Sequence, residues 1–134
     1  MKAMISLALV LSSTTLWAAP QTPSCPSDSE VIHECYATPQ AGDSEFAGSF
    51  TQGISICKSG FKYLMALTDT EGATQTGEVN AVIRVGGSQF SISQDGVDLK
   101  FSLVSGTFEP ITTAKLFVQV KEAMARGSTT FTCK

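Results

Sequence analysis

The chain has 134 residues, with 12 acidic side chains against 9 basic ones and a formal net charge of −3. This length suits a single domain. The basic residues form no cluster along the sequence, which argues against nucleic acid or an anionic lipid surface as a partner.

The N-terminus has the pattern of a secretory signal peptide. Lys2 precedes an apolar run over residues 5–11, and the small residues Ala18 and Ala19 offer a cleavage site. The run is too short to cross a bilayer, which takes about 20 apolar residues. We therefore predict a signal peptide over residues 1–19, a secreted or periplasmic location, and no transmembrane segment in the mature chain. Loss of Lys2 leaves 8 basic and 12 acidic residues, a net charge of −4.

The mature chain contains four cysteines, at Cys25, Cys35, Cys57 and Cys133. An even number of cysteines behind an export signal predicts two disulfides. Three pairings are possible, and we favour Cys35–Cys57 with Cys25–Cys133, because the second bridge would hold the last strand in place. A metal site is disfavoured although His33 lies close to Cys35, since the chain has one histidine and no Cys-x-x-Cys pair. We expect neither a metal nor another cofactor.

Residues 20–30 hold three prolines and read as an extended lead-in, followed by one domain over residues 31–134 in which apolar and polar residues alternate. The alternation is clearest over residues 97–103. The predicted strands, in chain order, are 31–38, 49–57, 61–68, 79–85, 89–93, 97–103, 114–121 and 129–133. Phe117 falls between the inward positions of its strand, so we expect it to face outward and to be available for a binding face.

Glycine-containing turns separate these strands. Residues 86–87 and 95–96 are two-residue hairpin signals, and residues 58–60 form another tight joint. Residues 122–126 could form one helical turn that Gly127 ends, but we interpret them as a hairpin connection between the strands over residues 114–121 and 129–133. Seven or eight short strands at about ten-residue spacing predict an all-β fold, either a small antiparallel β-sandwich or a β-barrel, with two disulfides.

Two sequence motifs resemble catalytic signatures but lack the structural context that those signatures have in enzymes. Ser55-Ile-Cys-Lys58 matches the Ser-x-x-Lys motif of penicillin-recognising enzymes, and Lys58-Ser-Gly60 matches their Lys-Ser/Thr-Gly triplet, but the two overlap on one residue within a predicted strand. A nucleophile–histidine site would have to use His33, which no loop motif accompanies. We therefore predict no catalytic residue of this kind.

Carboxylates are the remaining catalytic candidates. Asp43, Glu45, Asp69 and Glu71 lie in predicted loops, and a pair of them about 5–9 Å apart would suit a glycoside hydrolase. Turn chemistry explains loop acids equally well. A small carboxylate-dependent hydrolase is thus one alternative function, and an envelope assembly subunit with an unpaired edge strand is another.

The favoured function is a non-enzymatic binding or inhibitor-type module of the bacterial envelope, with another envelope protein as a possible partner. Its rigid β framework would carry recognition in the loops over residues 39–48 and 68–77. In size and in disulfide content the chain is similar to periplasmic lysozyme inhibitors. That resemblance implies a non-enzymatic β domain, and it assigns no individual residue to inhibition.

Overall fold

A computed structural model of the chain describes residues 22–68, 72–84, 87–104 and 112–134. Eight antiparallel strands form a closed barrel in which each strand pairs with its neighbours in the sequence and the first strand pairs with the last. The prediction of an all-β fold is therefore confirmed, in its barrel form. The strands are β1 (Glu30–Ala37), β2 (Gly53–Ser59), β3 (Lys62–Thr68), β4 (Thr74–Val82), β5 (Ser88–Gln94), β6 (Val97–Val104), β7 (Thr112–Val120) and β8 (Ala125–Cys133).

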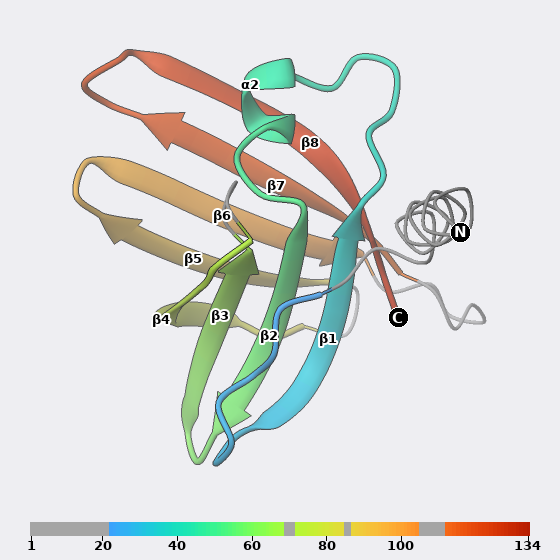
Figure 1. The fold of residues 1–134 in the computed structure, drawn as a ribbon, viewed down its shortest axis with the longest axis vertical. Coiled ribbons are helices and arrows are strands. Elements are labelled where there is room, and N and C mark those ends of the chain that lie inside the picture. Colours follow the sequence, from blue (N-terminus) through green and yellow to red (C-terminus); the bar gives the residue numbers. More distant parts are fainter. Residues whose placement is uncertain (1–21, 69–71, 85–86, 105–111) are drawn as a thin grey trace, which may run out of the picture.

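The barrel consists of two four-stranded halves joined at two narrow seams. Figure 1 shows β1, β2 and β3 running steeply through the view, with β5 to β8 lying across them. At one seam β4 pairs with β5 only from Asn80 to Val82, and at the other β1 pairs with β8 only from Cys35 to Ala37. The other neighbouring strands pair over most of their lengths.

The alternating side chains fill the barrel interior. Phe90, Phe101 and Phe131 are fully buried there, and the last two rings meet edge to face at 5.6 Å. Fully buried side chains of this size each stabilise the fold by about 1.5–3 kcal/mol. Ile54, Ile56, Leu116 and Val118 complete the centre of the core. Phe117, in contrast, is 45% exposed on the outer face, as its position in the alternation predicts.

All four cysteines form disulfides, but the pairing that we favoured is wrong. The bridges are Cys25–Cys57 and Cys35–Cys133. Cys35 lies opposite Ile54 in β2 and belongs to the interior cluster, whereas Cys57 lies opposite Val31, several residues along the ladder. Because alternate residues of a strand face opposite sides, Cys35 points into the barrel and Cys57 points out, so the two cannot meet.

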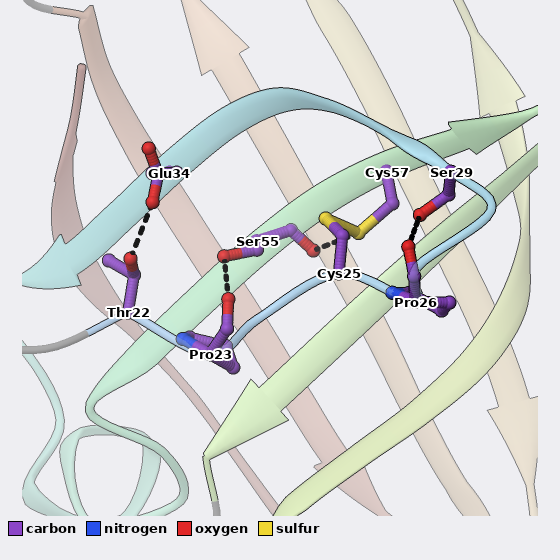
Figure 2. Close-up of a disulfide and its surroundings, with 8 residues drawn as sticks. All are labelled: Thr22, Pro23, Cys25, Pro26, Ser29, Glu34, Ser55 and Cys57. Carbon is purple, nitrogen blue, oxygen red and sulfur yellow. Dashed lines mark hydrogen bonds between the residues drawn. A yellow bond between two sulfur atoms is a disulfide. The ribbon is translucent and has the colours of Figure 1, made fainter.

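The N-terminal lead-in covers the outside of β2. Figure 2 shows Cys25 joined to Cys57, with the Ser55 hydroxyl donating to the Pro23 carbonyl at 2.5 Å. Thr22 also donates to the Glu34 carboxylate at 2.9 Å. These contacts explain why Ser55 and Cys57 are fully buried although they face away from the core. The predicted signal peptide lies outside the described residues and stays a prediction.

A short helix, α2 (Glu45–Gly48), precedes β2 and packs against β8. The predicted start of this strand at Ser49 was therefore too early. Two other boundaries also differ from the predictions. β4 begins at Thr74, inside the stretch that was expected to be a loop, and residues 121–124 form a turn from which β8 begins at Ala125. The connection between β7 and β8 is a hairpin turn, as we interpreted it, although it is shorter than predicted because β8 already begins at Ala125.

Candidate functional site

A pocket of about 610 Å³ opens at the mouth of the barrel, beside α2. Its walls come from five segments that are distant in the sequence: α2 and the loop after it, β3, β4, β5 with its turn, and β6. The apolar lining residues are Phe46, Phe50, Met65, Leu67, Ile92, Val97 and Leu99, and the polar ones are Ser49, Thr68, Gln75, Thr76, Gln94 and Asp95, with Gly77 between them. We call this cavity the mouth pocket.

The seam between β4 and β5 explains why the barrel is open at this end. β4 pairs with β3 from Thr74 to Val79, but its pairing with β5 begins only at Asn80. On the other side, Ile92 and Gln94 of β5 pair with β6 alone among the described residues. The two strands thus diverge toward the mouth and leave a space between them.

Gly77 and Ile92 face each other across this space. A Cβ atom built on Gly77 would lie 3.0 Å from the Ile92 Cδ1 atom, closer than carbon atoms normally pack. Glycine in a strand often marks a point where another group approaches the backbone closely. Here it admits the Ile92 side chain, which forms part of the apolar wall.

Mouths of β-barrels are frequent sites for small ligands, and an eight-stranded barrel is wide enough to hold one. Apolar walls with a few polar groups at the rim suit a molecule with an apolar body and a polar end. Asp95 is the single ionisable side chain among the described lining residues. The lining therefore offers surface for binding, and its ionisable groups supply no acid–base pair.

Asp43, one of the predicted carboxylates, anchors its loop to the barrel. Its Oδ2 atom accepts hydrogen bonds from the Gln40 and Thr130 amides at 2.8 and 3.0 Å, and its Oδ1 atom accepts from the Thr130 hydroxyl at 3.2 Å. Lys115 adds an ion pair at 3.4 Å, and the Asp43 side chain is only 5% exposed. The backbone hydrogen bond from Gln40, followed by those from Thr130, lowers the pKa of this carboxyl group.

The other candidate residues that the structure describes are not assembled around a common centre. Glu45 is exposed on α2, and Asp69 and Glu71 lie outside the described residues. His33 lies in β1 opposite Ile56, away from the mouth pocket, and its partial burial lowers the pKa of the imidazole. Within the described ranges, no group of three or more His, Cys, Asp or Glu side chains could hold a metal ion.

The mouth pocket was missed at the level of sequence because no single motif encodes it. Its only local signal is Gly77, a glycine inside a strand, and that residue had been assigned to a loop. No helix in the described part of the chain has the length and apolar character needed to span a membrane. Comparison of the chain with models of protein families, with curated proteins and with solved structures finds no match.

Proposed function

We propose that this protein is an exported, non-enzymatic binding module whose mouth pocket holds a small molecule with an apolar body and an uncharged polar end. The observation that carries this proposal is the mouth pocket itself, an apolar cavity of about 610 Å³ that the diverging β4 and β5 leave open. The two disulfides support export, because such bonds persist in oxidising compartments.

Two features favour this function over an inhibitor that inserts an acidic loop into an enzyme. The loop over residues 39–48 lies against the barrel, where Asp43 is almost completely buried and α2 contacts β8. Of the two acidic groups in this loop, Asp43 is therefore engaged within the protein, and only Glu45 stays exposed. The apolar surface, by contrast, is concave and suits a small ligand better than a protein surface.

Hydrolysis by two carboxylates has less support. Asp43 is satisfied by four contacts, and the only described acid that lines the mouth pocket is Asp95, in the turn after β5. An assembly subunit would need an unpaired strand to receive a partner. Each described strand pairs on both sides over at least part of its length.

Binding of N-phenyl-1-naphthylamine, an uncharged apolar fluorophore, tests the proposal. We expect the oxidised protein to enhance the fluorescence of this probe saturably. Gln75→Trp would fill the mouth pocket from β4 and weaken binding about tenfold or more. Gln52→Trp is the matched control, because Gln52 is exposed in the loop before β2 and lies outside the pocket lining. Absence of saturable binding, or equal binding by both variants, would contradict the proposal.

A further inference from the structure

The outer face of β5 to β8 forms a second recognition surface, distinct from the mouth pocket. The ladder aligns its outward side chains in three rows across the four strands. The first row is Gln89, Ser102, Lys115 and Thr130; the second is Ser91, Lys100, Phe117 and Ser128; the third is Ser93, Asp98, Gln119 and Arg126. Most of these residues line a shallow hollow of about 1020 Å³, which we call the outer groove.

The side chains of the outer groove suit the recognition of sugars. Short hydroxyl and amide groups both donate and accept hydrogen bonds, as sugar hydroxyls do. Phe117 lies in the middle row and is 45% exposed, with Lys100 and Ser128 as its direct cross-strand neighbours. An exposed aromatic ring amid polar groups provides a flat apolar surface on which the C–H face of a sugar ring can stack.

Charge distinguishes the outer groove from the rest of the protein. The mature chain is predicted to carry a net charge of −4, yet three cations, Lys100, Lys115 and Arg126, line the groove with one carboxylate, Asp98. Asp98 is already engaged by the Lys121 ammonium at 3.6 Å and by the Ser93 hydroxyl at 2.5 Å, and this Ser93 hydrogen bond, followed by Lys121, lowers its pKa. Topology thus gathers basic residues that the sequence keeps apart.

Two of these cations are available to a ligand. Lys115 pairs with Asp43, whereas Lys100 and Arg126 form no ion pair within the described ranges. They lie on β6 and β8, two strand spacings apart across the sheet and one row apart along it, which places their backbones about 12 Å apart on either side of Phe117. A chain with repeated carboxylates could contact both cations while one of its sugar rings covers the aromatic side chain.

We propose that the outer groove binds an acidic polysaccharide, with Phe117 stacking on a sugar ring and with Lys100 and Arg126 pairing with uronate carboxylates. A protein partner would need a larger apolar centre than one phenylalanine. Two available cations are few for nucleic acid, whose binding depends on many cations around the phosphate backbone. The proposal does not depend on the mouth pocket, so Gln75→Trp should bind polysaccharide as the unmodified protein does.

Polygalacturonate is the probe, and calorimetric titration at low salt gives the affinity. We expect Phe117→Ala to weaken binding about tenfold. Phe61→Ala is the matched control, since Phe61 is fully exposed on the distant hairpin between β2 and β3. Lys100→Gln with Arg126→Gln should weaken binding at least as much and reduce its salt dependence. Lys58→Gln with Lys62→Gln should leave both unchanged, because these two cations lie on the hairpin between β2 and β3, outside the groove lining. Thermal unfolding verifies that each variant is folded.

Each of four outcomes would overturn the proposal. The first is no binding of polygalacturonate to the unmodified protein, and the second is an equal effect of Phe117→Ala and Phe61→Ala. The third is binding of single-stranded DNA as tight as that of polygalacturonate, because the outer groove would then attract any polyanion. Weak or no binding of uncharged dextran is expected. Binding of dextran as tight as that of polygalacturonate would contradict the role of the two cations.

Discussion

At the scale of single residues, Thr129 carries a hydroxyl group that has no hydrogen-bond partner within the described part of the chain. The residue is fully buried in β8, beneath α2. A buried hydroxyl without a partner costs about 1–3 kcal/mol. We expect Thr129→Val, which keeps the shape and removes the hydroxyl, to raise the free energy of unfolding by about 1 kcal/mol. Urea denaturation checks this, and a less stable Val variant would show that the hydroxyl has an unseen partner.

Asp43 has the opposite character, because each of its oxygen atoms has partners. Asp43→Asn removes the charge that Lys115 and Thr130 contact, and it should cost about 1.5–3 kcal/mol of stability at pH 7. The pKa of Asp43 is lowered below its ordinary value of 3.8, so the folded state binds its proton less readily than the unfolded chain. Its stabilising contribution is therefore present above pH 3.8 and lost as pH falls through the lowered pKa. The difference in the free energy of unfolding between the two proteins should therefore be smaller at pH 3 than at pH 7, and urea denaturation at the two pH values checks this.

His33 gives the free energy of unfolding a second pH dependence, in the pH range where histidine titrates. The chain has no other histidine that could contribute there. Burial lowers the pKa of its imidazole below 6.5, so the unfolded chain binds the proton more readily than the folded one. The free energy of unfolding should fall as pH decreases from 6.5 to the lowered pKa, and stay level above that window. His33→Gln should flatten the curve there. An unchanged slope in the variant would assign the effect to another group.

At the scale of elements, α2 depends on a glycine in the strand beneath it. The Ser44 amide donates to the Ser128 carbonyl at 2.9 Å, and Ser44 caps the helix. A Cβ atom on Gly127 would lie 2.6 Å from the Ser44 Cβ atom, so Gly127→Ala should displace α2 and cost about 1–3 kcal/mol. Gly48→Ala is the matched control, because its Cβ would meet the Thr129 Oγ1 atom at an ordinary 3.6 Å. Equal stability of the two variants in urea would show that α2 tolerates the displacement.

The same elements show what sequence patterns can reveal. The strand of residues 97–103 was predicted almost to its ends, because its side chains alternate between interior and solvent and a two-residue turn precedes it. α2 was missed because a single helical turn has little intrinsic preference and forms here through contacts with β8. The start of β4 was missed because Thr74 to Glu78 are mostly exposed polar residues, and their strand conformation depends on pairing with β3.

At the scale of the whole molecule, the bridge Cys35–Cys133 closes the barrel where β1 and β8 share few backbone pairs. It links residues separated by 98 positions, against 32 for Cys25–Cys57. In the chain-entropy model the two bridges contribute about 4.7 and 3.7 kcal/mol. Replacing both cysteines of a bridge by alanine should therefore destabilise the protein more for Cys35 and Cys133. Thermal unfolding of the two double variants checks which of them is less stable. If the variant without Cys25–Cys57 is the less stable one, attachment of the lead-in contributes more to stability than closure of the barrel.

Neither the disulfide pairing nor the mouth pocket could be predicted from sequence patterns, and the physical reason is the same for both. Both depend on lateral register, that is, on which residues of neighbouring strands lie opposite one another. A shift of one residue would reverse the facing of Cys57 and would move Ile92 out of the pocket wall. Alternation within one strand does not determine this register, whereas the prediction of two disulfides required only the number of cysteines and the predicted export signal.

If the protein is exported as proposed, the crossed bridges bear on how the chain folds while it emerges from the export channel. The first cysteine pairs with the third and the second with the fourth, so Cys35 meets its partner only after β8 has emerged. Oxidation in the order of emergence would join Cys25 to Cys35, and that non-native bond must be exchanged before β1 can meet β8. Reshuffling by a thiol–disulfide isomerase is thus expected to limit the yield of native protein.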